Sequence, residues 1–227
     1  MDWTSRDIAK MIDHSLLKPE LTEEEVIKGC EIAKQYDVAT VCCDPSALPL
    51  VTKFLKGTDV KPTTVIGFPH GYNKTETKVF EAQQAIKDGA LEIDMVLNIG
   101  KLKSGDLDYV KKDIKAVVDT AHKSKVLVKV ILENYYLSND QKKIACKLCE
   151  EAGADWVKTS TGFAGGGATI EDLKLMRESV SQKVQVKAAG GVRTLEMALK
   201  VREAGCTRFG ATATIAIMEE CFKQSKK

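Results

Sequence analysis

The sequence predicts an α/β fold, a (β/α)8 or TIM barrel, formed as a single domain over residues 1–227. Short apolar runs rich in β-branched residues alternate along the chain with longer segments of helical periodicity. No linker or change of composition divides the chain. Its 227 residues are close to the roughly 250 that this barrel usually takes.

Eight segments have the length and composition of strands. They are residues 13–17, 38–43, 63–68, 92–99, 126–132, 155–160, 184–189 and 207–211. The helices expected between them include residues 22–36, 75–88, 106–122, 139–151, 170–180 and 194–204. This alternation indicates a parallel sheet, because parallel neighbours need a crossover segment. An open doubly wound sheet is the alternative, but the first strand-to-helix turn lacks the glycine-rich fingerprint of that fold.

Local signals mark where several helices begin and end. Thr22 with Glu25 matches a capping box. Thr169 with Asp172 matches one in which aspartate replaces the usual glutamate or glutamine. The related segments "KDGALEIDMV", "EAGADWVKTS" and "EAGCTRFGAT" each join a helix end to a strand through a glycine suited to a left-handed cap. These glycines are Gly89, Gly153 and Gly205.

Composition and charge exclude several classes of partner. The chain is 44% hydrophobic and 29% charged, with a net charge of +2, so no basic block is dense enough to follow a nucleic-acid backbone. No apolar run approaches the roughly 18 residues that a membrane span needs. The N-terminal sequence lacks the basic and apolar segments of a signal peptide. We therefore expect a cytoplasmic protein without nucleic-acid or membrane partners.

Cysteine and histidine spacing does not favour a metal site. The seven cysteines are odd in number and scattered, which indicates free thiols rather than a disulfide framework. Cys146 and Cys149 form a CxxC inside a helical pattern, where they are expected on the buried face. His14, His70 and His122 lie on separate elements without ligand spacing, although His14 is a candidate to line a pocket. We expect no metal and no cofactor.

Alternation along the strands predicts an unusually polar barrel interior. Alternate residues of each barrel strand point inward. This rule turns the side chain of Asn98 inward, together with five ionisable side chains. The five are Glu92, Asp94, Lys129, Lys158 and Lys187. They form either a paired ionic filling of the barrel or a reactive site with one surplus cation.

Two of these lysines have the position and surroundings of a nucleophile. Lys158 and Lys187 each precede a glycine-containing loop, which places them at the C-terminal face where barrel chemistry occurs. Burial and a neighbouring cation both lower the pKa of a lysine, and a neutral amine attacks carbonyl carbon. Asp94 remains open between a catalytic and a structural role. Lys129 is followed by three more strand residues and is expected deeper, in a structural role.

Glycine-containing loops after the last three expected strands indicate an anion site. The loops read "TGFAGGGAT", "AAGGVRT" and "FGATAT". Glycines leave backbone N–H groups accessible, and barrels commonly bind phosphate at this position. The candidate phosphate-binding residues are Thr161, Gly162, Gly190, Gly191, Thr212 and Ala213.

The motifs "IDHSLLKP", "GFPHG", "EIDMVLNIG", "VKTSTGF", "VKAAGGVRT" and "FGAT" resemble the deoxyribose-phosphate aldolase family, in the same order and over nearly the whole chain. The resemblance implies a metal-independent class I aldolase, a carbon–carbon lyase. Such an enzyme reversibly cleaves 2-deoxy-D-ribose 5-phosphate to acetaldehyde and D-glyceraldehyde 3-phosphate, in the catabolism of deoxyribose and deoxyribonucleotides. Its partners are small sugar phosphates and aldehydes, and a homodimer is one assembly that the sequence allows.

The resemblance also implies individual roles. Lys158 would form the Schiff base, Lys187 would perturb it, and Asp94 would relay protons through water. The position of Asp13 approaches the substrate in this family. Cys42 is expected inward from the second strand near the reactive lysine, either as a packing residue or as a thiol exposed to aldehydes.

The sequence departs from the family pattern at four places. Thr212 and Ala213 stand where two serines are frequent, and Phe163 stands where some members carry a lysine. His70 replaces an apolar residue, and the chain ends in lysines rather than a tyrosine that assists proton transfer. Three alternatives remain: another phosphate-binding barrel enzyme, a non-catalytic sugar-phosphate-binding barrel and a metal-dependent aldolase.

Overall fold

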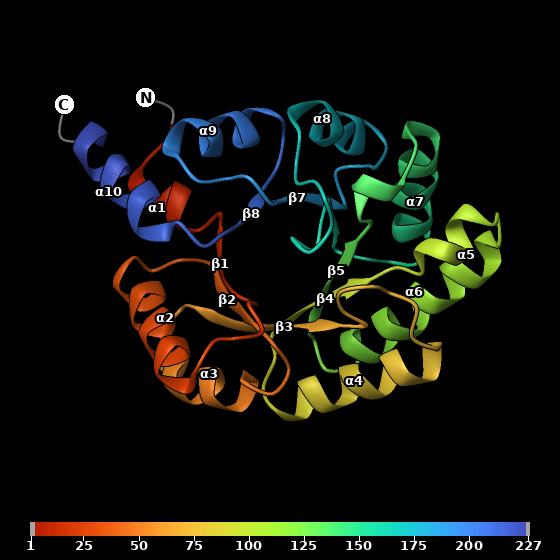
Figure 1. Ribbon diagram of the computed structural model, residues 1–227, viewed down its shortest axis with the longest axis horizontal. Helices are drawn as coiled ribbons and strands as arrows, with labels where there is room; N and C mark the ends of the chain where they lie inside the picture. The colour runs from red at the N-terminus through yellow and green to blue at the C-terminus, as the bar shows by residue number, and fades with distance from the viewer. Residues whose placement is uncertain (1–2, 226–227) are drawn as a thin grey trace.

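Eight parallel strands form one closed barrel in chain order, which confirms the predicted (β/α)8 architecture (Figure 1). The computed structural model describes residues 3–225. The lysines at the extreme C-terminus, which replace the family's tyrosine, lie outside these residues. The strands are β1 (Ile12–Leu16), β2 (Thr40–Cys43), β3 (Lys61–Ile66), β4 (Glu92–Val96), β5 (Leu127–Ile131), β6 (Trp156–Lys158), β7 (Gln185–Ala189) and β8 (Arg208–Ala211).

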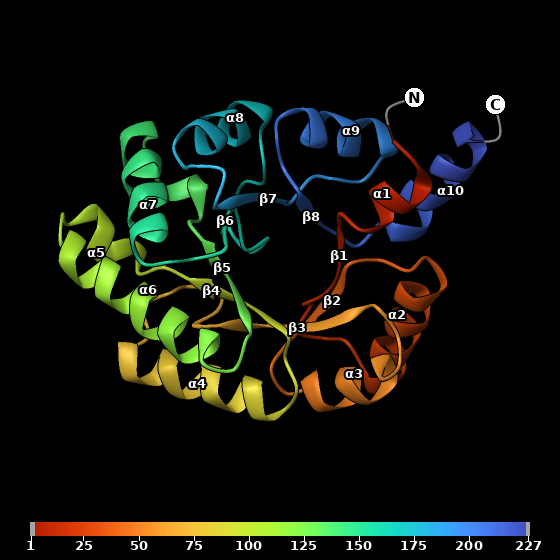
Figure 2. The ribbon, with the colours of Figure 1, turned by 180° about the vertical axis from the view of Figure 1, so that it is seen from behind.

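Helices surround the barrel on its outer side (Figures 1 and 2). They are α1 (Ser5–Ala9), α2 (Glu23–Gln35), α3 (Leu48–Leu55), α4 (Thr75–Lys87), α5 (Ile99–Lys103), α6 (Leu107–His122), α7 (Asn139–Glu151), α8 (Ile170–Glu178), α9 (Leu195–Glu203) and α10 (Thr214–Ser225), with a short 3-10 helix η1 (Asn134–Tyr136). α1 and α10 lie side by side, so the first and last helices pack together.

The barrel closes through pairing of β1 with β8, in which Asp13 is opposite Gly210. The pairing of β6 with β7 places Lys158 opposite Lys187. Residues that are adjacent across the sheet share the inward direction, so these two lysines enter the interior side by side. The pairing therefore brings together side chains that are far apart in the sequence.

The strands begin and end within three residues of the expected positions, and two of the differences have a clear physical cause. β4 ends at Val96 rather than at residue 99, because the side chain of Asn98 accepts from the Lys101 N–H and starts α5. The predicted inward direction of Asn98 is therefore wrong. β3 ends at Ile66, because Gly67 has a φ of +60°, which turns the chain out of the sheet.

Helix ends follow the predicted signals, with one difference. Thr22 and Glu25 form the complete capping box. The Thr169 hydroxyl accepts from the Asp172 N–H, but the reciprocal bond is missing because the Asp172 carboxylate binds Lys142 instead, at 2.7 Å. The predicted left-handed caps are confirmed, with φ values of +95°, +85° and +88° at Gly89, Gly153 and Gly205.

The apolar core lies between the strands and the helices rather than inside the barrel. Ile93 and Met95 on β4 point to the helices and are fully buried, as the alternation predicted. Cys146 and Cys149 are buried on α7, which confirms that their CxxC is the inner face of a helix. The interior is consequently free to hold polar side chains.

Within residues 3–225 no helix combines the length and apolar character needed to cross a membrane. Over the same residues, no group of three or more His, Cys, Asp and Glu side chains is placed to hold a metal ion.

We expect Thr22→Ala to lower the free energy of unfolding by about 1 kcal/mol, because it leaves an N-terminal amide of α2 without its acceptor. Urea denaturation followed by circular dichroism measures the change. Thr120→Ala is the matched control, since the Thr120 hydroxyl bonds to the Ala116 carbonyl within α6 and caps no helix end. Equal losses in both variants would contradict the role of the cap.

Candidate active site

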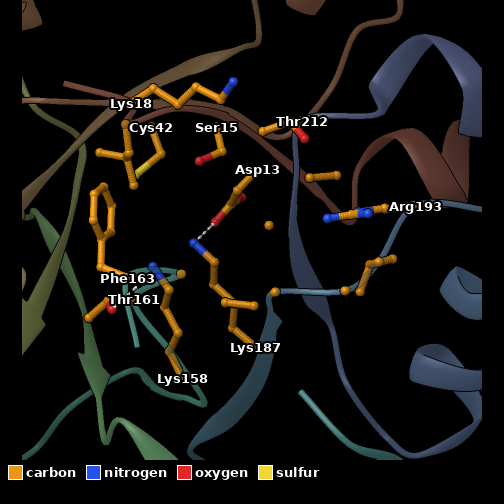
Figure 3. Close-up of a pocket in the computed structure, with 18 of the residues that line it drawn as sticks. Asp13, Ser15, Lys18, Cys42, Lys158, Thr161, Phe163, Lys187, Arg193 and Thr212 are labelled. Atoms are coloured by element: carbon orange, nitrogen blue, oxygen red, sulfur yellow. Dashed lines mark hydrogen bonds and ion pairs between the residues drawn. The ribbon is translucent and has the colours of Figure 1, made fainter. Parts of the chain in front are cut away.

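A pocket of about 360 Å³ opens at the carboxyl ends of the strands (Figure 3). Asp13 and Cys42 line it from β1 and β2, and Lys158 and Lys187 line it from β6 and β7. All four side chains are nearly or fully buried. The pocket therefore meets the polar interior of the barrel at its floor, on rigid strands rather than on loops.

One carboxylate oxygen joins the two lysines at this floor. Asp94 Oδ2 lies 2.7 Å from Lys158 Nζ and 2.8 Å from Lys187 Nζ, and it accepts a hydrogen bond from each. Lys187 also makes a close ion pair with Asp13 Oδ2, the contact drawn in Figure 3. We call Asp13, Asp94, Lys158 and Lys187 the upper ionic layer. It contains two carboxylates and two lysines, so it has no net charge when all four are ionised.

Asp94 is fully buried and reaches the pocket only through the lysines. Its second oxygen, Oδ1, accepts from Lys129 Nζ at 3.0 Å. Burial alone would raise the pKa of the Asp94 carboxyl, but the three surrounding lysines outweigh burial and hold this pKa well below its ordinary value. The group is therefore a carboxylate with both oxygens engaged.

The two lysines of the upper ionic layer differ in acidity. Burial lowers the pKa of Lys158, Asp94 opposes this change, Lys187 adds to it, and the net pKa is below the ordinary value. Burial would also lower the pKa of Lys187, but the neighbouring carboxylates of Asp13 and Asp94 outweigh burial and raise this pKa. The Lys158 amine therefore loses its proton more readily than the Lys187 amine beside it.

Cys42 and Asp13 complete the floor. Burial raises the pKa of the Cys42 thiol to about 11, so it is a neutral thiol near pH 7 and a weak nucleophile. Asp13 is also buried, yet Lys187, Arg208 and Lys129 hold the pKa of its carboxyl below the ordinary value. Asp13 Oδ2 pairs with Lys187 and Asp13 Oδ1 lies 3.2 Å from Arg208 Nε, so both carboxylate oxygens face cations of the barrel interior.

Lys129 lies deeper than the pocket, as expected. It is fully buried, is not part of the pocket wall, and pairs with Glu92 Oε2 at 2.5 Å as well as with Asp94. The sequence analysis did not include Arg208 among the interior charges. Arg208 and Gly210 are two residues apart on β8, so their side-chain positions share one face of the strand. This alternation was the signal that could have placed Arg208 in the interior.

Another part of the pocket wall is built from loops that contain glycine. Gly190 and Gly191 have φ values of +83° and +90°, and a Cβ added at Gly190 would lie 2.9 Å from the Cα of Gly167. Thr212 lines the pocket just before α10 begins at Thr214, whereas Ala213 does not line it, contrary to expectation. Backbone N–H groups at such a helix start favour an anion.

Arg193 and Lys18 line the mouth of the pocket, and the sequence analysis identified neither. Arg193 lies near Thr212, on the side away from Phe163 (Figure 3). Lys18 extends from the loop after β1, and its side chain is 70% exposed. These two cations make the mouth attractive to an anionic ligand.

The loop after β6 supplies the wall next to Lys158. The N–H and hydroxyl of Thr161 both donate to the Glu133 carboxylate, so Thr161 shapes the wall rather than offering a free donor. Gly162, next in the chain, also lines the pocket and has a φ of +89°. Phe163 packs edge-to-face on Phe68, with 5.3 Å between ring centroids, and makes this side apolar.

The histidines do not take part in the pocket. The expectation that His14 lines it is wrong, because His14 Nδ1 lies 2.8 Å from Thr214 Oγ1 and the ring is buried outside the pocket wall. Burial lowers the pKa of His14 to about 4. His70 stacks on Tyr72, and His122 ends α6 and pairs with Asp155.

A closed (β/α)8 barrel that presents a buried amine, a neighbouring carboxylate and a cationic mouth to one pocket has the architecture of an aldolase. Residues 8–218 match the model of the DeoC/LacD family aldolases. The chain therefore belongs to the DeoC/LacD aldolase family, which confirms the resemblance read from its motifs. It is an enzyme of the carbon–carbon lyase class.

Curated relatives and solved structures agree with this assignment. The chain is 57% identical to the deoxyribose-phosphate aldolase of Thermoanaerobacter sp. (strain X514), over 94% of this chain and 96% of that protein. The corresponding enzyme of Thermococcus gammatolerans is 54% identical over 94% and 96%. The structure of "QR15, an Aldolase" superposes with a TM-score of 0.92 at 40% identity, over 97% of this chain and 98% of that one. The tetrameric deoxyribose phosphate aldolase of Aeropyrum pernix has a TM-score of 0.90 at 30% identity, over 98% and 93%.

We expect Lys187→Leu to move the reaction of Lys158 with acetaldehyde to higher pH by about one unit, because removing a neighbouring cation favours the protonated amine. The measurement is the pH dependence of covalent trapping by acetaldehyde and cyanoborohydride. Lys143→Leu is the control, since its side chain is 57% exposed on α7. An unchanged or lower midpoint in Lys187→Leu would show that Lys187 does not lower the pKa of Lys158.

Proposed function

We propose that this enzyme reversibly cleaves 2-deoxy-D-ribose 5-phosphate to acetaldehyde and D-glyceraldehyde 3-phosphate through a Schiff base on Lys158. The observation that carries the proposal is the Lys158 amine, whose pKa burial and Lys187 lower and which Asp94 holds 2.7 Å away at the floor of an anion-attracting pocket. The names of the relatives support the substrate. The proposed role is in the catabolism of deoxyribose and deoxyribonucleotides, without metal or cofactor.

The first half of the proposed reaction forms the Schiff base. The neutral Lys158 amine attacks the C1 aldehyde of the open-chain sugar and forms a carbinolamine. Loss of water from the carbinolamine gives an iminium, and Lys187 is placed to donate a proton to the departing hydroxyl because it remains an ammonium group beside Lys158. Its charge also opposes protonation of the free Lys158 amine between turnovers.

The second half of the proposed reaction breaks the C2–C3 bond of the sugar. A proton leaves the C3 hydroxyl, the C2–C3 bond breaks, and its electron pair moves into the iminium to form an enamine. D-Glyceraldehyde 3-phosphate departs, C2 takes up a proton, and water releases acetaldehyde from Lys158. Asp94 is buried, so we propose that it moves protons through an ordered water and the lysines rather than by direct contact with substrate. Asp13 lines the pocket beside Lys187, and we propose that it helps to orient a substrate hydroxyl there.

The glycine side of the pocket suits the phosphate. Gly190, Gly191, Thr212 and Arg193 gather there, next to the start of α10. The opposite, apolar side at Phe163 suits the two-carbon aldehyde portion beside Lys158. A substrate bound in this way spans the pocket with its carbonyl carbon at the amine and its charge at the mouth.

A different barrel enzyme or a non-catalytic sugar-phosphate-binding protein would use the same glycine loops but would not need a reactive lysine. Covalent trapping separates these alternatives from the proposal. The expected homodimer and cytoplasmic location stay predictions, as does the action of residues 1–227 as one aldolase domain.

We expect Lys158→Ala to abolish both turnover and the adduct formed with acetaldehyde and borohydride, because the only proposed nucleophile is gone. Asp94→Asn should still form the adduct slowly but lose turnover by about two orders of magnitude or more, as expected for loss of acid–base catalysis. Mass spectrometry of peptides locates the adduct. An adduct on Lys187 or Lys129 in Lys158→Ala would show that the nucleophile is misassigned while the reaction class stands.

We expect Arg193→Met to raise KM for 2-deoxy-D-ribose 5-phosphate about tenfold, since a charge-assisted contact of about 1.4 kcal/mol is lost. KM for unphosphorylated 2-deoxyribose should stay the same. Thr212→Val is the companion variant, which removes a hydroxyl but keeps the backbone N–H, and its effect should be smaller. Equal increases for both sugars in Arg193→Met would place the phosphate elsewhere.

A further inference from the structure

A second group of charges fills the barrel beneath the upper ionic layer. Arg208 Nη2 donates to Glu92 Oε2 at 2.5 Å, and Lys129 Nζ contacts the same oxygen at 2.5 Å. Trp156 lies against both cations, with its ring centroid 5.5 Å from Lys129 Nζ and 5.6 Å from Arg208 Cζ. We call Glu92, Lys129 and Arg208 the lower ionic layer. None of the three lines the pocket or can touch substrate.

The lower ionic layer contacts both carboxylates above it. Lys129 binds Asp94 Oδ1 at 3.0 Å, which leaves Oδ2 for the two pocket lysines. Arg208 Nε lies 3.2 Å from Asp13 Oδ1, while Oδ2 pairs with Lys187. One oxygen of each carboxylate is thus held from below, and the other pairs with the lysines that line the pocket.

The lower ionic layer also contains the surplus charge of the interior. It has two cations and one carboxylate, whereas the upper ionic layer is balanced. Burial would raise the pKa of Glu92, but Lys129 and Arg208 outweigh burial and keep it ionised. Lys61 approaches Glu92 Oε1 at 3.3 Å, but its side chain is 45% exposed, so solvent screens that charge.

We propose that Glu92 and Arg208 are positioning residues for the aldolase reaction, which orient the two upper carboxylates and set the net charge that the Schiff-base lysine faces. The inference rests on the proposed function of Lys158. Arg208 holds Asp13 and Glu92 at once, and Glu92 fixes the two cations that reach upward. Charge in a buried interior of low dielectric constant acts at longer range than at the surface, so residues that never touch substrate influence the amine.

Charged and titratable groups face Lys158 from most of the strands, so the effect of the lower ionic layer has to be separated from theirs. Asp94 on β4, Lys187 on β7 and Cys42 on β2 act on Lys158 directly. Behind them lie Asp13 on β1, Glu92 on β4, Lys129 on β5 and Arg208 on β8, and Lys18 and Arg193 line the mouth of the pocket. Variants of Glu92 and Arg208 leave every other member of this set in place. Their effects have opposite signs, which a purely structural role does not predict.

Arg208→Gln removes the surplus cation, so the protonated form of Lys158 becomes more favourable and trapping moves to higher pH. Glu92→Gln removes an anion, so the protonated form becomes less favourable and trapping moves to lower pH. Each shift should be about one pH unit, the size expected for unit charges about 10 Å apart at an effective dielectric constant near 20. The double variant Glu92→Gln/Arg208→Gln keeps the net charge, so its trapping midpoint should lie between those of the two single variants.

The experiment measures the rate of adduct formation with acetaldehyde and cyanoborohydride from pH 6 to 10, with peptide mapping of Lys158 and thermal denaturation of each variant. Asp113→Asn is the matched control. It breaks a fully buried ion pair outside the barrel interior, between Asp113 on α6 and Lys78 on α4. This variant should lose stability without a shift of the trapping midpoint. Arg208→Lys keeps the charge and should keep the midpoint.

Opposite shifts in the two single variants, with an unmoved control, support the proposal. Shifts of the same sign, or midpoints that match Asp113→Asn, overturn it. If Arg208→Gln does not fold, Glu92→Gln decides alone: a lower midpoint supports the proposal, and an unchanged or higher midpoint overturns it. Failure of the proposed function is a separate result, because the unmodified enzyme would then give no adduct on Lys158.

Discussion

The carboxylate of Asp94 is the contact on which the barrel interior depends. Its two oxygens accept from lysines on β5, β6 and β7, and none of these lysines has a large exposed surface. Moving ammonium groups out of water costs several kcal/mol each unless a counter-charge is close. Without this carboxylate the three buried lysines would repel one another. With it, the interior holds amines at fixed positions and at different acidities.

A polar interior changes where the fold finds its stability. The apolar side chains of the strands face the helices, and the core lies in that outer layer. The barrel interior is then filled by charged side chains instead of apolar ones. Because the reactive groups stand on strands, their positions depend on the hydrogen-bonded register of the sheet and not on loop conformation. The loops supply the glycines and Arg193 that line the pocket mouth, where we propose that the phosphate binds.

Close backbone approach joins two of these loops. Gly167 and Gly190 face each other so closely that a Cβ on either would fall within 3 Å of the other's backbone. The Ala168 N–H is 3.0 Å from the Ala189 carbonyl, which ties the loop after β6 to the end of β7. Backbone contacts therefore join the loop after β6 to the turn at Gly190 that lines the pocket, and the two strands before them bear Lys158 and Lys187.

The sequence by itself determined the strands, to within a few residues, and the inward direction of Asp94, Lys158 and Lys187. Both properties are local, since strand composition and two-residue alternation are read from neighbouring residues. The tertiary structure decided the partners. That Lys187 meets Asp13, and that Arg208 joins the interior, depends on closure between β8 and β1, which brings together residues almost 200 positions apart. No spacing in the chain encodes such pairs, because side-chain length and sheet register select them only after the barrel has closed.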